Sequence, residues 1–467
     1  MDSYSETLNS FLMYSRRDST LEFEVRIRDV TSAEFYKCLA VFSRAFPPQK
    51  PVESTEQLYT AGRGCIKCTT DSRMYKETIK SCVVHDSRLK LALSIEQPVG
   101  FDVQLGKLSC IRKKSRRSFK TNYVTIDFTV VNETHYEIEL EFVRPLPLNF
   151  GVGEIKQNID FLLKTLQHGT IRFVGLSETR TVLKEYLNVF KTVLFAGAQP
   201  ETLHHRHIPL VKDSTKYLVT PKIDGDRCLL FVYRNTGYII DSNASTVTVA
   251  IESLKEESRV SVFDAERVHG KVFLFDTLFY NGVDVRKFVL KDRLQLATQF
   301  VSQVPQNRDY TVTVKEYFTS VGNVIVPEGV QTDGYIFVPI DEPYPVTRKW
   351  PGLLKWKPAD KTTIDFYSVN VHDDTWELRV KNATDTYPVL FSPQESTTFP
   401  NGTIDQSTGL AFKTGTVIEY SWDGKRFVPL RTRWDKTANP RKHGNFETVA
   451  MDIFKSILNS VSLDLLL

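Results

Sequence analysis

The sequence predicts an α+β fold built from several domains, and three observations support this. At 467 residues the chain is too long for one ordinary hydrophobic core. Strand patterns follow one another through residues 21–145 and return in 217–360 and in 362–433. Helical patterns are few and lie between or after these blocks. We therefore expect three domains, at residues 1–192, 193–361 and 362–467.

The individual elements follow from local patterns. Residues 21–28, 124–131 and 136–143 alternate or are rich in β-branched and aromatic side chains, which is typical of strands. Residues 154–166 and 179–190 have helical spacing, and the first segment places five apolar side chains on one face: Ile155, Ile159, Leu162, Leu163 and Leu166. The block 362–433 carries the glycine and proline turns of a small barrel. The tail 445–467 has the spacing of an amphipathic helix that packs on its own domain.

Composition excludes several classes of protein. Hydrophobic residues make up 41% and charged residues 25%, which is globular composition. The net charge is only +4, so any nucleic-acid site must be a local concentration of lysine and arginine. No apolar run approaches the roughly 18–20 residues that cross a bilayer, and Met1–Thr20 has no apolar signal-peptide core. Six cysteines in this length predict reduced thiols, hence an intracellular compartment such as cytoplasm or nucleus.

One cysteine pattern allows a metal site. Cys65, Cys68, Cys82 and His85 have the spacing of a zinc knuckle. If Cys65 and Cys68 lie on a strand, however, their odd offset points them to opposite faces. The sequence leaves both interpretations open and favours the strand.

A single lysine stands at the end of an apolar strand and before a glycine turn, in Tyr217-Leu-Val-Thr-Pro-Lys222-Ile-Asp224-Gly-Asp-Arg227. A lysine attacks phosphorus only as the free amine, so its ordinary pKa of about 10.4 has to be lowered by nearby cations or a metal. Lys355 and Lys357 alternate on one later strand and can supply that positive field while holding an α-phosphate. Alone, the Lys-x-Asp-Gly turn is equally typical of a solvated β-turn.

The motifs that follow this turn resemble, in order, those of the covalent nucleotidyltransferases: capping guanylyltransferases and the ATP- or NAD-dependent ligases. The matching segments are Phe263-Asp-Ala-Glu266, Phe273-Leu-Phe275-Asp276, Thr332-Asp333-Gly-Tyr and Leu354-Lys355-Trp-Lys357. The resemblance implies an ATP-grasp-like domain of antiparallel sheets and helices in which Lys222 becomes covalently nucleotidylated. It also implies nucleotide contacts for Asp224, Arg227 (ribose), Glu266 (ribose or metal), Phe275 (base, with Phe273 as second choice), Asp333 (metal-bound water), Lys355 and Lys357. The family usually has glycine at Ala265.

Three segments resemble the capping branch more than the ligases. These are Phe195–Pro200 ahead of the lysine, Thr363-Ile-Asp365-Phe366, and Arg431-Thr-Arg433-Trp-Asp435-Lys436-x₂-Asn439-Pro440. The last one resembles a motif of a C-terminal OB-type barrel that closes over the β- and γ-phosphates. Asp365, Arg433, Asp435 and Lys436 are therefore expected to bind nucleotide. The Asn-Pro order, and Ser242 where an arginine is common, indicate a divergent and viral member.

Two N-terminal strands carry rows of acids. In a strand, Glu22, Glu24, Arg26 and Arg28 project to one face, and so do Glu137, Glu139 and Glu141. Between them, Arg112, Lys114 and Arg116 form a row of cations. Acids and cations together are what a metal-dependent phosphohydrolase needs, although two solvated amphipathic strands would show the same alternation.

This set resembles the tunnel-type metal-dependent RNA triphosphatases, which have a closed eight-stranded β-tunnel. The resemblance implies Mg²⁺ or Mn²⁺ on Glu22, Glu24, Glu139 and Glu141, with Glu137 supporting the attacking water or acting as base. It implies phosphate contacts for Arg26, Lys67, Arg112, Lys114 and Arg116, with Asp127 supporting the cationic row.

Together the two resemblances predict an enzyme that forms mRNA 5′ caps. It would hydrolyse the γ-phosphate of triphosphate-ended RNA and transfer GMP from GTP, through lysyl-GMP on Lys222, to the diphosphate end. We find no methyltransferase fingerprint, so N7 methylation would need a separate chain. The alternatives are a polynucleotide ligase that works through lysyl-AMP and a capping-competent or stabilising subunit of a viral RNA polymerase. A viral factory or virion would then be an additional location.

Overall fold

The computed structural model describes residues 3–18, 20–46, 50–143, 147, 149–167, 171–244, 247–252, 254, 259–268, 270–305, 310–437 and 443–467. The chain divides into two compact units, Met1–Leu166 with Ile404–Leu410, and Gln167–Thr403 with Ala411–Leu467. We expected the first boundary at residue 192, but helix α4 (Leu176–Phe190) buries Val182 and Tyr186 in the core of the second unit. The second unit contains both of the further domains that we expected.

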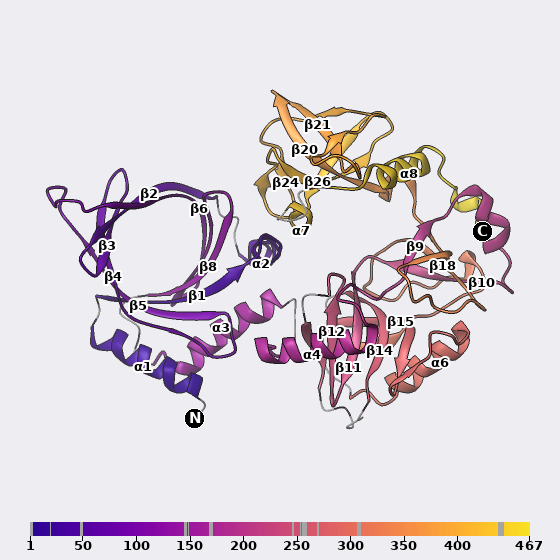
Figure 1. Ribbon diagram of the computed structural model, residues 1–467, viewed down its shortest axis with the longest axis horizontal. Coiled ribbons are helices and arrows are strands. Elements are labelled where there is room, and N and C mark those ends of the chain that lie inside the picture. The colour runs from indigo at the N-terminus through magenta and orange to yellow at the C-terminus, as the bar shows by residue number, and fades with distance from the viewer. Residues whose placement is uncertain are drawn as a thin grey trace. The chain divides into compact units, whose positions relative to one another are not determined.

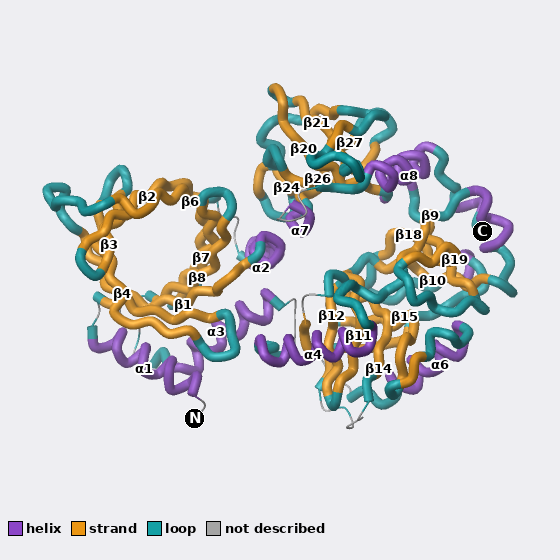
Figure 2. Tube along the Cα trace, viewed as in Figure 1, coloured by secondary structure: helices purple, strands orange, loops and turns teal. Residues whose placement is uncertain are grey.

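A closed antiparallel barrel forms the first unit, with the strand order β1-β5-β4-β3-β2-β6-β7-β8 (Figures 1 and 2). Its strands are β1 Leu21–Val30, β2 Val52–Ala61, β3 Gly64–Cys68, β4 Arg73–Val83, β5 Leu89–Pro98, β6 Leu108–Lys120, β7 Val124–Val131 and β8 His135–Phe142. Each strand pairs on both sides, so closure leaves no unpaired edge. The predicted eight-stranded tunnel is confirmed.

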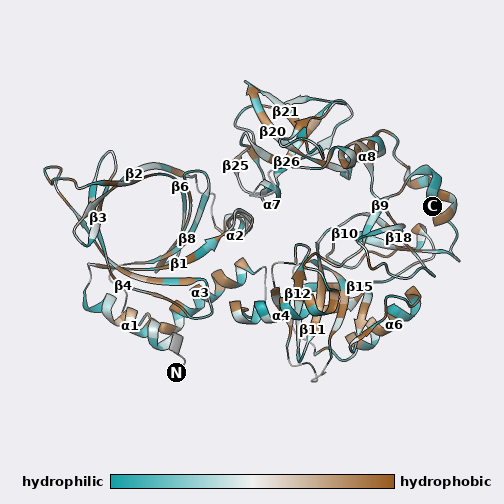
Figure 3. Cartoon of the chain, viewed as in Figure 1, coloured by the Kyte–Doolittle hydropathy of each residue, from teal (hydrophilic) through white to brown (hydrophobic). Residues whose placement is uncertain are grey.

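The barrel wall has an apolar outer face and a charged inner face. Helices α1 (Ser3–Arg17), α2 (Ser32–Ala45) and α3 (Val152–Leu166) cover part of the outside. The rings of Phe11 on α1 and Phe23 on β1 lie 5.7 Å apart, and Phe42 on α2 lies 5.3 Å from Phe128 on β7. Figure 3 shows both colours along α1 and α3, as expected for helices with one buried side. Because Phe23, Val25 and Ile27 point outward, the residues between them face the lumen.

The helix expected at 154–166 is confirmed, and its five predicted apolar residues are all buried. Helices α1 and α2 were not predicted. Helix α2 begins with a capping box, in which Thr31 and Glu34 satisfy each other's backbone N–H groups. That signal was readable in the sequence.

Two mostly antiparallel sheets form the first part of the second unit. The smaller has the order β10-β18-β19-β9, with β9 Gln199–Thr202, β10 Tyr217–Ile223, β18 Thr332–Pro339 and β19 Lys349–Trp356; only its β19–β9 pair is parallel. The larger follows β13-β12-β11-β14-β15-β16, and β17 adds to β15 in parallel. Its strands are β11 Asp226–Tyr233, β12 Thr236–Asp241, β13 Val247–Ile251, β14 Ser261–Val268, β15 Lys271–Tyr280, β16 Val283–Asp284 and β17 Thr311–Val314. Helix α6 (Leu290–Val301) packs on this larger sheet through Ala297 and Phe300, and the short helix α5 is Ile208–Val211.

The C-terminal part has an antiparallel sheet of order β22-β21-β20-β26-β27, with β23 also paired to β21. Its elements are β20 Thr363–His372, β21 Thr375–Val380, β22 Val389–Leu390, β23 Ser396–Thr398, β26 Thr416–Trp422, β27 Phe427–Thr432, α7 Trp434–Thr437 and α8 Glu447–Leu458; the small β24 Ile404–Asp405 pairs with β25 Leu410–Ala411. Helix α8 is the predicted tail helix, and its Ala450, Phe454 and Ile457 pack on this sheet as expected. The OB-type closure stays a prediction. Of the helices in the described ranges, none is long and apolar enough to cross a membrane.

Candidate active sites

Lys222 sits at the end of β10, where the register of β10 against β18 shifts between Pro221 and Ile223. Its Nζ donates a hydrogen bond to Asp333 Oδ1 at 2.7 Å, and Lys357 forms an ion pair with the other oxygen of the same carboxylate. Burial alone would raise the pKa of Asp333, but the two lysines outweigh it and lower that pKa. The structure therefore brings together the predicted nucleophile and two of its predicted partners.

Lys355 lies on β19, two residues before Lys357, and is partly buried. Burial and the neighbouring charges of Lys357 and Lys222 lower the pKa of Lys355. Two lysines thus contact one carboxylate, Asp333, and Lys355 lies near enough to both lysines to feel their charge. This excess of positive charge is what a triphosphate would neutralise on binding.

Arg227 lies on the next strand, β11, and forms a two-point ion pair with the fully buried Asp264. Its Nη2 is 2.6 Å from Asp264 Oδ2 and its Nε is 3.2 Å from Oδ1. The guanidinium stands over two rings, 5.7 Å from the centroid of Phe195 and 5.4 Å from that of Phe275. Phe275 is partly exposed, whereas Phe273 is buried in a small core cluster with Ile223 and Val330. This contrast supports Phe275 as the ring available to a base.

Glu266 and the buried Lys315 interact electrostatically beside these residues. Burial raises the pKa of Glu266, although Lys315, Arg227 and Lys222 oppose the shift. Burial also lowers the pKa of Lys315. The Lys315 Nζ is 5.6 Å from the centroid of the Phe275 ring. Sequence reasoning missed Lys315, because this residue follows the short strand β17 and lies within no motif. Asp224, which we predicted, has an exposed side chain, and its backbone N–H donates a hydrogen bond to the carbonyl of Gln331.

The last predicted motif assembles around Asp365 on β20. Arg433 Nη1 donates to Asp365 Oδ2 at 2.8 Å, and Lys436 pairs with the same oxygen. The other carboxylate oxygen, Oδ1, is buried with no hydrogen-bond partner among the described residues. The Asp435 side chain and residues Asn439 and Pro440 lie outside the described residues.

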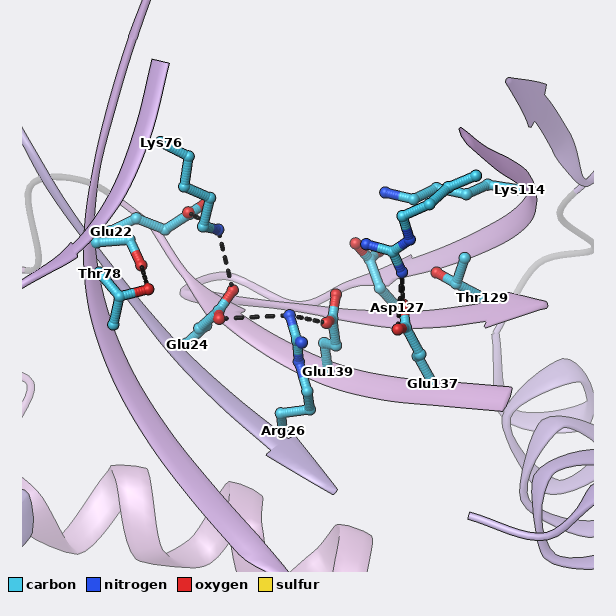
Figure 4. Close-up of polar contacts among 12 residues, drawn as sticks. Glu22, Glu24, Arg26, Lys76, Thr78, Lys114, Asp127, Thr129, Glu137 and Glu139 are labelled. Carbon is cyan, nitrogen blue, oxygen red and sulfur yellow. Dashed lines mark hydrogen bonds and ion pairs between the residues drawn. The ribbon is translucent and has the colours of Figure 1, made fainter. Parts of the chain in front are cut away.

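The barrel lumen collects the acids of the two predicted strands. In the register of β1 against β8, Glu24 pairs with Glu141 and Arg26 with Glu139, so these side chains share the inner face. Glu22 is buried on the same face, and Figure 4 shows Glu22, Glu24 and Glu139 reaching inward beside cationic side chains. The register of β7 against β8 adds Asp127, opposite Glu139.

Every cation predicted for the lumen has an acidic partner there. The pairs are Arg26–Glu139 (2.5 Å), Arg112–Glu137 (2.6 Å), Lys114–Glu56 (2.6 Å), Arg116–Asp127 (2.8 Å) and Lys67–Glu96. Asp127 therefore supports the cationic row as expected. Sequence reasoning missed Glu56, Lys76 and Glu96. Lys76 Nζ lies 2.9 Å from Glu22, 3.5 Å from Glu24 and 2.9 Å from Glu96. The sequence does contain a sign of these three residues, because polar side chains alternate along their strands, but we had located those strands only coarsely.

Whether the carboxylates of the lumen can bind a metal ion depends on the cations that they already contact, Arg26 and Lys76. Carboxylate oxygens are suitable ligands for Mg²⁺ or Mn²⁺, and Glu22, Glu24 and Glu139 come from two adjacent strands. Across the described parts of the chain, however, no group of three or more His, Cys, Asp or Glu side chains is arranged to hold a metal. In the lumen, Lys76 and Arg26 take up the oxygens instead. The donor chemistry fits, and a divalent ion would compete with these two cations.

The structure places the cysteines of the zinc-knuckle spacing on strands of the barrel wall. Cys65 and Cys68 both lie on β3, and the register pairs Cys65 with the lumen residue Lys76 and Cys68 with Arg73. The two thiols therefore point to opposite faces of the strand, as the odd offset predicts. His85 is exposed, and all three cysteines of the pattern are free thiols.

Comparisons with known proteins agree with the geometry of the lysine site. Residues 164–359 match the family described as mRNA capping enzyme, catalytic domain. A probable mRNA-capping enzyme of Acanthamoeba polyphaga mimivirus is 22% identical over 76% of this chain and 41% of its own length. The mRNA-capping enzyme subunit alpha of Schizosaccharomyces pombe is 25% identical over 37% of this chain and 52% of its own. This chain thus spans only about half, or less, of these relatives.

Among solved structures, the mimivirus capping enzyme triphosphatase aligns with 36% of this chain and 98% of its own, at 14% identity and a TM-score of 0.30. A mycobacterial DNA ligase D complexed with ATP aligns with 48% of this chain and 87% of its own, at 14% identity and a TM-score of 0.30. These alignments are too loose to carry an argument about function. The family match rests on the region that contains Lys222, Asp333, Lys355 and Lys357. Through this region, the chain is similar to the catalytic domain of mRNA capping enzymes.

Proposed function

We propose that this chain catalyses guanylyl transfer in mRNA 5′-cap formation, with Lys222 as the nucleophile. The observation that carries the proposal is the convergence of Lys222 and Lys357 on Asp333, with Lys355 beside them, in a region that matches the capping catalytic domain. An amine held among further cations is suited to attack at an α-phosphate.

The reaction has two steps. The Lys222 amine attacks the α-phosphorus of GTP, an N–P bond forms, pyrophosphate leaves, and the amine releases a proton to solvent. The terminal phosphate of diphosphate-ended RNA then attacks the same phosphorus, the N–P bond breaks, and GMP is transferred. Lys355 and Lys357 offset the negative charge that builds up on the phosphoryl oxygens. Arg227 and Phe275 bind the nucleoside, with Glu266 at the ribose, and Arg433 and Lys436 contact the β- and γ-phosphates.

We further propose that the barrel hydrolyses the γ-phosphate of triphosphate-ended RNA, which produces the diphosphate end that the second step needs. Its lumen presents acids and cations on facing strands, which suits a hydrolase of a polyanionic substrate. Glu22, Glu24, Glu139 and Glu141 would hold Mg²⁺ or Mn²⁺, which supplies a counter-charge to the phosphate oxygens. Arg26, Lys67, Arg112, Lys114 and Arg116 would bind phosphate, and Glu137 would orient the attacking water.

The experiment that tests guanylyl transfer is incubation with α-³²P-GTP and Mg²⁺, followed by denaturing electrophoresis. A labelled band that survives denaturation supports lysyl-GMP. A parallel reaction with α-³²P-ATP separates the ligase alternative: label from ATP alone would contradict the capping proposal. Release of labelled phosphate from γ-³²P-ended RNA tests the barrel.

The proposal implies partners of defined chemistry. The RNA substrate carries a 5′ triphosphate, and N7 methylation comes from a separate methyltransferase. A viral RNA polymerase would be the physical partner if the chain also serves as its subunit, which co-purification would reveal. The six cysteines are free thiols, which is consistent with a protein that functions in a reducing compartment such as the cytoplasm, the nucleus or a viral factory.

A further inference from the structure

Tyr344 connects three segments of the nucleotide site that are far apart in the sequence. Its ring is 3% exposed and lies in the same hydrophobic cluster as Phe195 and Ala198. The backbone N–H of Ala198 donates to the Tyr344 hydroxyl at 2.6 Å. That hydroxyl in turn donates to Asp264 Oδ2. Tyr344 thereby links the 195–200 segment to the carboxylate that holds Arg227.

Asp264 has no exposure to solvent, so its charge depends wholly on its partners. Arg227 supplies one charge-assisted pair through two nitrogens, and Tyr344 supplies the second donor. Burial and the charge of Asp264 raise the pKa of Tyr344 well above its ordinary value. The hydroxyl therefore keeps its proton and remains a donor at neutral pH.

The orientation of Arg227 matters because its guanidinium stands over both Phe195 and Phe275. Phe195 belongs to the segment that Tyr344 holds through Ala198, and Phe275 is the ring expected to meet the base. There is little room for adjustment: a Cβ on Gly197 would lie 3.1 Å from Arg227 Nη2 and 2.2 Å from the Phe195 ring. The guanidinium therefore packs directly against the 195–200 segment.

We propose that Tyr344 is a positioning residue for nucleotide binding, which fixes the Arg227–Asp264 pair against the 195–200 segment. The inference rests on the proposed function, since it assigns Arg227 to the ribose of GTP. Tyr344 itself touches no substrate. Its hydroxyl acts through Asp264 on Arg227, and its effect falls on binding rather than on attack by Lys222.

The test is Tyr344→Phe, which keeps the ring and removes the hydroxyl. The GTP concentration for half-maximal lysyl-GMP formation is expected to rise about tenfold, the scale of one lost hydrogen bond to a charged group. The maximal labelling rate should stay within about twofold, because Lys222, Lys355 and Lys357 are untouched. The matched control is Tyr238→Phe. Tyr238 is buried in the same cluster and donates to a carboxylate of Glu178 at 2.8 Å, so it controls for the loss of a buried hydroxyl.

A double-mutant cycle separates positioning from general stability. If Tyr344 acts through Arg227, Tyr344→Phe should add no further rise in the half-maximal GTP concentration when Arg227→Ala is already present. An equal rise in both backgrounds, or a rise of the same size in Tyr238→Phe, would overturn the inference. So would an unchanged GTP response in folded Tyr344→Phe.

If Tyr344→Phe does not fold, Asp264→Asn replaces it, because the amide keeps the shape and loses the charge that Arg227 pairs with. The same rise in the half-maximal GTP concentration is expected, and parent behaviour of the folded variant would contradict the inference. Failure of the proposed function is distinguishable: in that case the parent protein itself takes no label from GTP.

Discussion

Lys222 and Asp333 form a direct ion pair, with 2.7 Å between Nζ and Oδ1. An ammonium group that donates to a carboxylate has no lone pair to offer to phosphorus. Lys357 contacts the second oxygen of Asp333, so the carboxylate is shared between the proposed nucleophile and a lysine proposed to bind phosphate. If Lys222 is the nucleophile that we propose, it must leave this pair before it can attack GTP.

The first prediction concerns Lys222. Lys222→Ala should abolish GTP-derived label that survives denaturation. Lys222→Arg should fail equally, because guanidinium keeps the charge but is effectively never deprotonated. Full labelling of either variant, measured by denaturing electrophoresis, would remove Lys222 from its role.

The second prediction concerns the paired lysines. Lys355→Ala and Lys357→Ala should each slow lysyl-GMP formation by roughly tens of fold or more, because each removes a charge contact to the transferring phosphoryl group. Release of γ-phosphate from RNA should be unaffected, since both residues belong to another unit than the barrel. Parent labelling rates in both variants would mean that the α-phosphate binds elsewhere.

The third prediction is that substitutions in the barrel abolish γ-phosphate release and leave guanylylation of Lys222 intact. Alanine at Glu22, Glu24, Glu139 or Glu141 should collapse γ-phosphate release, and Arg112→Ala or Arg116→Ala should do the same. Labelling of Lys222 should persist in all of them. Hydrolysis should also need Mg²⁺ or Mn²⁺ and stop on chelation. If folded Glu22→Ala and Glu139→Ala still hydrolyse at the parent rate, the barrel is not the triphosphatase.

The fourth prediction concerns stability and pH. Burial would raise the pKa of Glu96, but Lys67 and Lys76 outweigh it and lower the pKa to about 2. A carboxyl with a lowered folded-state pKa stabilises the fold above its unfolded pKa, near 4.5, and loses that contribution as pH falls from there toward 2.

The Tm difference between the parent and Glu96→Gln should therefore be largest at neutral pH and shrink below about pH 4.5. Glu53→Gln is a suitable control, since Glu53 is exposed and accepts a hydrogen bond from the Ser115 hydroxyl at 2.5 Å. A Tm difference that does not change with pH would show that the charge of Glu96 is irrelevant to the fold.

Much of this protein could be predicted from its sequence, for a physical reason. Alternation along β1 and β8 and helical spacing along α3 are local patterns, and a strand or helix translates them directly into faces. The glutamate rows, the cationic row on β6 and the order of the motifs around Lys222 needed no knowledge of distant residues. The domain boundary at 192 was wrong because the burial of α4 depends on the sheet it packs against.

Tertiary structure alone decided which charges meet. In the barrel β5 pairs with β1, and β4 pairs with β5, so that Lys76 and Glu96 join the acids Glu22 and Glu24 in the lumen. The connection between β18 and β19 brings Tyr344 to Asp264, and the pairing of β14 and β17 with β15 places Lys315 beside Glu266. These pairs are separated by dozens of residues, and no local pattern reports them. The sequence determined which chemical groups the chain presents and on which face, whereas the fold determined their partners, because ion pairing and desolvation depend on distance in space and not on spacing along the chain.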